Sequence, residues 1–275
     1  MKKNLALELA RYVSLALILV WGIWPFVYAL TVSLRPDPEI FSRPFHWIPW
    51  EPTLKHYIRA FEVYNYAQYA LNGLIIAAGG TLIAMLVAIP AAYALGRKRF
   101  PASRLIFYSI VITMLFPGIL LIIPLYLIFL RLGLVNTYPG LWIAIGFGAA
   151  PLQVWILRDF FAKLPVEVEE AAMLDGCSAA GAFFRVVLPL ARPAIGASLA
   201  LSFLGGWQNF ITVFILGSSS MYNAVCSLYY YSVGTEMVFW GELMASAIMT
   251  MLPVTILYFF IQKFVVRGLS ITVAE

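Results

Sequence analysis

Five carboxylates lie within residues 159–175 of a chain that is otherwise nearly uncharged. Among them, Glu169 and Glu170 stand directly before Ala171 and Ala172, in the stretch EEAAMLDG. An amphipathic connector resting on lipid headgroups is one interpretation of such a segment. Anionic headgroups repel carboxylates, however, so a groove in another protein is the better explanation of this concentration of negative charge.

The patterns that support catalysis or metal binding are missing from the sequence. His46 and His56 have no Cys or Glu at ligand spacing, and we interpret both as surface or interface residues. Cys177 and Cys226 lie on either side of an apolar run, so neither a disulfide nor a metal site is expected. No G-x-x-x-x-G-K-[ST] loop occurs that could cradle nucleotide phosphates. We therefore predict a protein with no ATPase site of its own, no metal and no cofactor.

The composition indicates an integral membrane protein. Hydrophobic residues make up 63% of the 275 residues and charged residues only 11%, whereas a soluble domain is about half apolar and about a quarter charged. No basic stripe interleaved with aromatic residues is present, so nucleic acid is not an expected partner. The first apolar run is too long for the core of a signal peptide, and no A-x-A site closes it, which predicts a retained first span.

Six segments are long and apolar enough to cross a bilayer, which requires about 20 residues each. The resulting all-α integral membrane domain occupies the whole chain, residues 1–275. The third span contains Pro117, Gly118 and Pro124 and should kink or unwind. A short interfacial helix is expected near 53–66, and an outer loop after the fifth span, where a seventh span is the alternative. The six spans are roughly 12–34, 70–95, 105–130, 138–158, 193–216 and 242–262.

The distribution of Lys and Arg predicts the orientation. With six spans, 13 of the 18 basic residues, including Lys2, Lys3 and Arg99, fall on the side of the termini, and five fall on the other side. Because cytoplasmic loops carry the excess of Lys and Arg, both termini and the polar segment 159–192 should face the cytoplasm of the inner membrane.

The polar segment predicts two helices joined by a sharp turn. Pro165 suits a first helical position, and the following glutamates suit the positive end of a helix dipole. Gly176 permits a left-handed elbow, and Ser178 can cap a second helix over roughly 179–187, which Pro189 should end. Four small or short side chains recur on one face of the first helix: Val168, Ala171, Ala172 and Asp175.

This stretch resembles the signature loop of ABC importer permeases, E-A-A-x-x-x-G-x9-I-x-L-P. The stretches YALNGLIIAAGGTLIAMLVAIPAAYALGR and FFAKLPVEVEEAAMLDG are similar to the carbohydrate branch, in particular to the smaller membrane subunit of maltose-type transporters. The sequence WQNF departs from that branch, which usually has an acid at its third position, and the tail GLSITVAE is also atypical. The loop positions that match are Glu170, Ala171, Ala172, Gly176, Leu188 and Pro189, with Val186 in place of the usual Ile.

The resemblance implies a type I importer fold in which the loop forms a coupling helix. Such a helix docks on cytoplasmic ATP-binding subunits, while a second related permease completes the membrane pore and an extracytoplasmic binding protein delivers the solute. The expected function is import of a sugar or oligosaccharide; the alternative is another solute, such as a polyol, glycerol phosphate or amino acid. The coupling residues implied are Glu169, Glu170, Ala171, Ala172, Asp175, Gly176, Leu188 and Pro189.

The predicted spans are almost free of ionisable side chains, which argues against an ion-coupled carrier, because such groups mark ion pathways. A neutral or weakly polar solute suits aromatic stacking and hydrogen bonds instead. The candidates for lining its path are Asn72 in the second span and Trp207, Gln208 and Asn209 in the fifth. For Asn72, a hydrogen bond between helices is the alternative interpretation.

Overall fold

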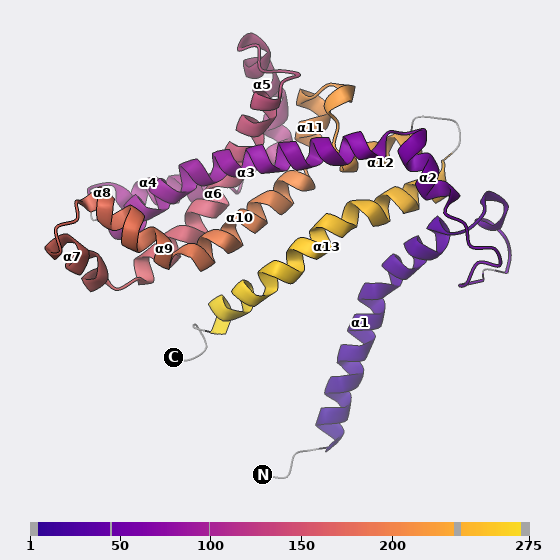
Figure 1. Cartoon of the computed structure of the whole chain (residues 1–275), viewed down its shortest axis with the longest axis horizontal. Helices are drawn as coiled ribbons and strands as arrows, with labels where there is room; N and C mark the ends of the chain where they lie inside the picture. Colours follow the sequence, from indigo (N-terminus) through magenta and orange to yellow (C-terminus); the bar gives the residue numbers. More distant parts are fainter. Residues whose placement is uncertain (1–4, 45, 99, 234–237, 271–275) are drawn as a thin grey trace. The chain divides into compact units, whose positions relative to one another are not determined.

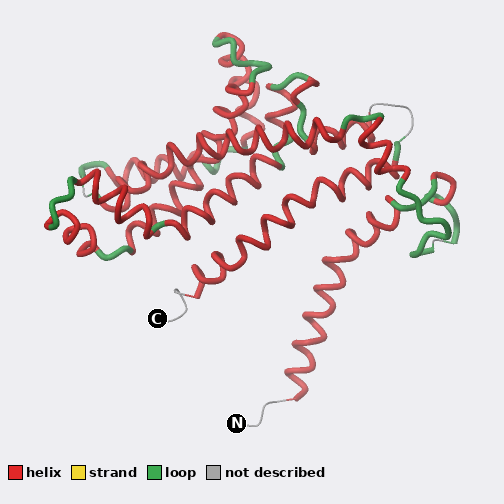
Figure 2. The backbone as a smooth tube through the Cα atoms, in the orientation of Figure 1, coloured by secondary structure: helices red, strands yellow, loops and turns green. Residues whose placement is uncertain are grey.

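The computed structural model describes residues 5–44, 46–98, 100–233 and 238–270, and these form helices and loops with no β-strand (Figure 1, Figure 2). Lys2, Lys3, Arg99 and the last residues of the tail, 271–275, lie outside the described residues. The chain divides into two compact units, one of residues 1–67 with 227–252 and the other of residues 68–226 with 253–275.

The helices follow one another with short connections, apart from the polar loop after α1. Their bounds are α1 (Leu5–Ser33), η1 (Asp37–Glu39), α2 (Lys55–Glu62), α3 (Tyr66–Arg97), α4 (Ser103–Thr113), α5 (Gly118–Arg131), α6 (Tyr138–Lys163), α7 (Val166–Leu174), α8 (Ala179–Ala182), η2 (Phe183–Val187), α9 (Leu188–Leu190), α10 (Arg192–Trp207), α11 (Ile211–Leu216), η3 (Ser219–Met221), α12 (Ala224–Val233) and α13 (Trp240–Ser270).

Apolar helix covers most of each predicted span, with interruptions in the third and the fifth. Among the described residues, four stretches qualify singly as spans, in α1, α3, α6 and α13, and two bent pairs bring the number to six. The first pair is α4 with α5, bent by 97°. This break lies at Pro117, as the sequence predicted, because proline cannot donate the hydrogen bond that would continue the helix. The short α12, with 10 residues, is about 15 Å long and cannot cross an apolar layer of about 30 Å.

The second bent pair joins the helices α8–α9 to α10 at an angle of 74°. The expected helix end at Pro189 is wrong, because η2 is a wider, π-helical turn and the chain continues helically through Pro189 to Leu190. A π-helical turn changes the local hydrogen-bond pattern, and this is where helices accommodate bends. The expected span 193–216 is interrupted after Trp207 and resumes at Ile211.

Close helix contacts hold the second unit together, because α6 packs on α10 and both helices approach α3 closely (Figure 1). At Gly146 of α6, an added Cβ would lie 2.7 Å from Ile83 and 2.8 Å from the carbonyl oxygen of Gly80, both in α3. Small residues at such crossings allow backbones to approach closely inside membranes. The absence of a side chain at Gly146 therefore sets the distance between α3 and α6.

We predict that Gly146→Ala destabilises the protein by about 1–3 kcal/mol, the usual cost of overpacking. Gly148→Ala is the matched control in the same helix, since an added Cβ there meets nothing within 4 Å. That change should be neutral or slightly stabilising, because alanine favours helix over glycine. Thermal unfolding of the detergent-purified variants measures both effects, and equal midpoints for the two would contradict the close crossing.

Candidate functional site

The polar loop folds as two helices with a left-handed elbow between them, as the sequence predicted. Gly176 has a φ of +93°. Its N–H donates to the carbonyl of Met173 at 3.1 Å, and the N–H of Cys177 donates to the carbonyl of Ala172 at 3.0 Å. This pair of hydrogen bonds is the Schellman motif, which satisfies the carbonyl groups at a helix C-terminus. The elbow therefore ends α7 and reverses the chain within two residues.

The returning helix is capped and anchored. Ser178 caps α8 by accepting a hydrogen bond from the N–H of Gly181 at 3.1 Å. Farther along, Val187 and Ala191 are buried in an apolar cluster with side chains of α3 and α6 such as Leu157. Leu188 and Pro189, which match the end of the family motif, are half-buried in the same arm. The second arm of the loop is thus part of the packed body of the second unit.

The first arm, α7, divides the predicted coupling residues between two faces. Glu169 and Ala172 point inward and are buried. The outer face is exposed, and its most exposed side chain is Leu174, at 88%. The remaining exposed residues of α7 and its C-cap are Val166, Glu167, Val168, Glu170, Ala171, Met173 and Asp175.

Glu169 is 5% exposed and receives hydrogen bonds from two residues of α3. The phenol of Tyr93 donates to its Oε1, and Arg97 donates from Nε to its Oε2 at 3.2 Å. Burial alone would raise the pKa of Glu169, but the hydrogen bond from Tyr93 and the charges of Lys98 and Arg97 outweigh it, so this pKa is lowered. The carboxylate is therefore ionised at neutral pH and tied to this chain, where the sequence had suggested a basic partner subunit.

The candidate pathway residue Asn72 is fully buried and uses both ends of its amide. Its Nδ2 donates to the carbonyls of Ser220 and Tyr222 at 2.8 and 3.0 Å. Its Oδ1 accepts from Tyr138 and Gln68, each at 2.9 Å. All the hydrogen-bonding positions of the amide are occupied, so Asn72 connects α3 to the loop around η3.

The other pathway candidates surround the break between α10 and α11. Trp207 is buried against Gly73 of α3, where an added Cβ would lie 3.0 Å from the indole ring. Asn209 accepts from the N–H of Thr212 at 3.1 Å, while Gln208 is exposed. Sequence reasoning missed Asn223, whose Nδ2 donates to the carbonyl of Asn209 at 2.9 Å. Its only signal in the sequence is an amide within a Ser- and Tyr-rich loop.

A cavity of about 880 Å³ lies in the second unit, bordered by the α4–α5 bend, α6 and α10. Most of its lining is apolar, and none of the lining residues carries a formal charge. Two buried polar side chains reach it: Gln153, whose Oε1 accepts from Ser198 at 2.6 Å, and Ser202. The Ser202 hydroxyl has no hydrogen-bond partner among the described residues. No pattern in the sequence indicates this cavity.

The family model for a binding-protein-dependent transport system inner membrane component matches residues 80–271 of this chain. The chain belongs to this family. The segment matched includes α7, the elbow and most of the membrane helices, so the predicted ABC importer permease is confirmed.

Relatives and a solved structure agree with this family. The permease is 30% identical to the sulfoquinovosyl glycerol transport system permease protein SmoH of Agrobacterium fabrum, over 94% of this chain and 91% of that protein. It is 33% identical to the diacetylchitobiose uptake system permease protein NgcG of Streptomyces coelicolor, over 94% and 87%. A bacterial ABC transporter involved in the import of the acidic polysaccharide alginate has a chain of the same fold, with a TM-score of 0.83, 22% identity and coverage of 96% and 98%. The predicted all-α permease fold is thereby confirmed.

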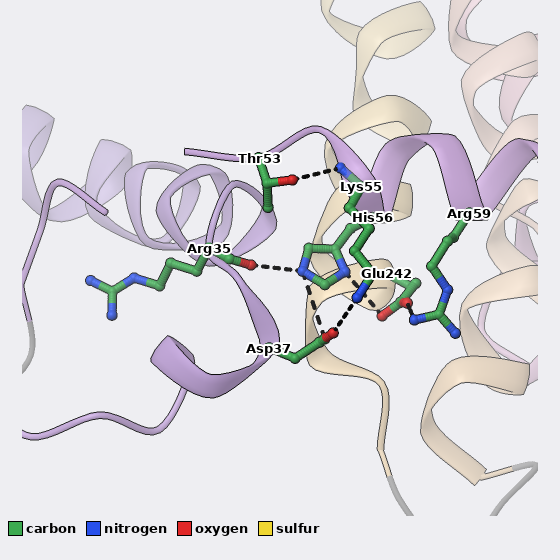
Figure 3. A network of polar contacts seen from close by, with 7 residues as sticks. All are labelled: Arg35, Asp37, Thr53, Lys55, His56, Arg59 and Glu242. Atoms are coloured by element: carbon green, nitrogen blue, oxygen red, sulfur yellow. Dashed lines mark hydrogen bonds and ion pairs between the residues drawn. The ribbon is translucent and has the colours of Figure 1, made fainter. Parts of the chain in front are cut away.

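The first unit of the permease contains a buried ion cluster, drawn in Figure 3. The His56 ring is fully buried; its Nε2 donates to the carbonyl of Arg35 at 2.7 Å, and its Nδ1 lies 3.3 Å from the Glu242 carboxylate. Arg59 lies 2.6 Å from the other oxygen of Glu242. The interpretation of His56 as a surface residue is therefore wrong, because its partner Glu242 is remote in sequence.

The protonation of His56 follows from these contacts. Both ring nitrogens face acceptors, and only the doubly protonated ring can donate to both. The hydrogen bond with Glu242 is the largest influence and raises the pKa of His56, although burial opposes it. Asp37 also faces the ring, 3.9 Å from Nε2, and its pKa is lowered chiefly by the hydrogen bond from Lys55.

Asp37, His56 and Glu242 offer ligand atoms within 4.8 Å of one another, a geometry that can hold a metal ion. In this cluster, however, Lys55 lies 2.9 Å from Asp37 and Arg59 lies 2.6 Å from Glu242. Both carboxylates are thus already paired with fixed cations, which repel a divalent ion. We therefore assign the group as an ion-pair cluster that fastens α2 to the first turn of α13.

We predict that this anchor weakens as the pH rises. Because the folded pKa of His56 is raised, its stabilisation is complete below the ordinary histidine pKa of about 6.5 and is lost as pH climbs through the folded value. Amide hydrogen exchange becomes faster with rising pH even in an unfolded chain. Between about pH 5.5 and about pH 8.5, exchange of the amides in α2, Lys55–Glu62, should accelerate by more than this intrinsic effect. His56→Gln should abolish this excess and His46→Gln should retain it; an excess that survives His56→Gln would contradict the assignment.

Proposed function

We propose that this permease carries a neutral saccharide across the cytoplasmic membrane, driven by ATP that separate cytoplasmic subunits hydrolyse. The observation that carries the proposal is the geometry of α7, an exposed helix that projects from the packed body on a Schellman elbow. Its sequence matches the family's loop at Glu170, Ala171, Ala172 and Gly176. The names of the two relatives described above, for sulfoquinovosyl glycerol and for diacetylchitobiose, support a carbohydrate solute. Because the first of these carries a sulfonate, the proposal that the solute is neutral rests on the uncharged cavity of this subunit.

The outer face of α7 has the composition expected of a docking surface. Its exposed side chains are partly apolar, with Val166, Met173 and Leu174, and partly acidic, with Glu167, Glu170 and Asp175. Exposed apolar side chains next to charged ones are typical of a surface that binds another protein. The complementary surface on the ATP-binding subunit is a groove with both apolar and basic groups. Ala172 contributes indirectly, because its small size lets α7 lie close to the body.

The remaining partners follow from the family and from the charge distribution. An extracytoplasmic binding protein delivers the solute, and a second, related permease subunit encloses the pathway together with this one. The excess of Lys and Arg on the side of the termini supports cytoplasmic placement of both ends and of the loop 159–192. Lipid covers the remaining apolar surface of the spans.

Within this subunit, the cavity beside the α4–α5 bend is the best candidate for a part of the pathway. Its uncharged lining suits a neutral solute better than a glycerol phosphate, which requires basic groups for its phosphate. Gln153 and Ser202 supply the hydrogen-bonding groups, and Ser202 has a free hydroxyl that a sugar hydroxyl can meet. Exposed Gln208 stays a pathway candidate, while Asn72, Trp207 and Asn209 chiefly support the helix break.

We expect that deleting the gene abolishes uptake of one neutral saccharide and leaves uptake of glycerol phosphate and amino acids intact. Complementation of the deletion with variants tests the pathway. Gly205→Val adds bulk to the cavity lining and should lower uptake about tenfold or more, because it obstructs the bound solute. Gly196→Val in the same helix is the control; neither glycine's Cβ meets anything within 4 Å, and Gly196 does not line the cavity. If the deletion abolishes uptake of a charged solute instead, the proposal of a neutral saccharide is refuted. If the two valine variants support equal uptake, the proposal that the cavity is part of the pathway is refuted.

The orientation and the docking surface are tested together by cysteine labelling in a variant whose Cys177 and Cys226 are replaced by serine. Leu174→Cys should react with an impermeant maleimide only after the cells are permeabilised, and should cross-link to the ATP-binding subunit in the assembled complex. Ile48→Cys, 81% exposed in the loop after α1, should react in intact spheroplasts and should not cross-link. The reverse pattern of labelling would overturn the orientation.

A further inference from the structure

We infer that Glu169, Arg97 and Tyr93 form a joint that makes α7 move together with α3 and α6, and that Glu169 is the positioning residue of this joint. The inference rests on the proposed docking of α7 on an ATP-binding subunit. It concerns the next step, namely how a displacement of α7 reaches the membrane helices.

The joint has an ion pair at its centre. Arg97, at the last position of α3, contacts Oε2 of Glu169 through Nε at 3.2 Å and through Nη2 at 3.1 Å. The other carboxylate oxygen accepts from Tyr93 and lies 3.6 Å from the Lys98 ammonium group. The Glu169 and Arg97 side chains are both at least nine-tenths buried. Because Arg97 holds one carboxylate oxygen and Tyr93 the other, these charge-assisted contacts fix the orientation of the carboxylate.

Arg97 also connects α6 to the same point. Its Nη1 donates to the carbonyl of Leu164 at 2.7 Å, and its Nη2 donates to the carbonyl of Pro165 at 3.1 Å. Leu164 is the C-cap of α6 and Pro165 is the N-cap of α7. Carbonyls at a helix C-terminus, such as that of Leu164, have no partner within the helix. One guanidinium group therefore binds the ends of three helices.

Close approach of α3 to α6 makes this possible. At Gly96, the residue before Arg97, an added Cβ would lie 2.8 Å from the carbonyl oxygen of Arg158 in α6. Tyr93 lies one turn earlier, with its ring 5.8 Å from that of Phe161 in α6 and 4.5 Å from that of Phe183 in the returning arm. The phenol that holds Glu169 is thus itself held by both neighbouring elements.

The joint is the polar attachment of α7 to α3, while α7 also packs against α8 and η2 of the returning arm. Glu169 and Ala172 are the buried residues of this nine-residue helix, and alanine contributes little apolar area. The other arm of the loop is anchored independently by Ala182, Val187 and Ala191. Removing the Glu169 charge should therefore leave the fold of the body and the exposed docking surface in place, and loosen only the connection of α7 to α3.

The test uses the assembled transporter in proteoliposomes, with the ATP-binding subunits, the second permease and the binding protein. Glu169→Gln should lower the uptake per ATP hydrolysed about tenfold or more, the scale of a lost charge-assisted hydrogen bond. Tyr93→Phe, which removes a single donor, should have a smaller effect in the same direction. Glu62→Gln, at an exposed carboxylate of α2 outside the coupling loop, is the control for the same chemical change and should retain the wild-type ratio.

Cross-linking from Leu174→Cys separates the two proposals. If it captures the ATP-binding subunit in the Glu169→Gln background as efficiently as in the wild type while uptake per ATP falls, the joint is supported. If it captures the subunit and uptake per ATP is unchanged in both Glu169→Gln and Tyr93→Phe, the joint is overturned and the docking proposal stands. If it fails to capture the subunit even in the wild-type background, the proposed function itself fails.

Discussion

The close crossing of α3 and α6 is the contact on which the rest of the second unit depends. Gly146 in its middle and Gly96 at its end allow the two backbones to approach closely. Inside a membrane such packing is the main source of helix association, because lipid chains offer apolar side chains an equally good environment. The same crossing brings Tyr93 and Arg97 of α3 to the end of α6, where the coupling loop begins. The position of α7 is therefore a consequence of how two membrane helices pack.

The breaks in the helices impose a second constraint, because each frees backbone groups that water cannot reach inside a membrane. The Asn223 amide bonds the carbonyl of Asn209 beside the interruption of α10 and α11, and its Oδ1 accepts from the N–H of Cys226 at 2.9 Å. Asn72 does the same for the carbonyls around η3. The Asn side chains in these apolar surroundings form hydrogen bonds with backbone groups, so the same amides are not available to bind the solute. The uncharged cavity is less affected by this competition, because the Ser202 hydroxyl has no hydrogen-bond partner among the described residues.

Local features of the loop and the spans could be predicted from the sequence, because they depend on residues a few positions apart. The elbow at Gly176, the cap at Ser178 and the break at Pro117 each follow from backbone chemistry within one turn. The inward direction of Glu169 could not be predicted, since it depends on Tyr93 and Arg97 far along the chain. Pairing of His56 with Glu242 was missed for the same reason. At Pro189 the local rule failed, because a π-helical turn redirects the hydrogen bonds that the proline would otherwise break.

The choice of ionised and aromatic groups at the joint has a mechanical consequence that apolar packing would lack. A buried ion pair adds little net stability, because desolvation of the two charges offsets their attraction, but it is formed only within a narrow range of geometries.

The two partners of the ion pair are also held to different extents. Arg97 retains the carbonyls of Leu164 and Pro165 if Glu169 is neutralised. Without Arg97, the partners that Glu169 keeps among the described residues are Tyr93 and the half-exposed Lys98. Arg97 is thus the fixed part of the joint, bound to the end of α6, and Glu169 is the detachable part carried by α7. Such an arrangement resists rotation of α7 about the elbow at Gly176 while the fold of the helices behind it stays independent of the contact.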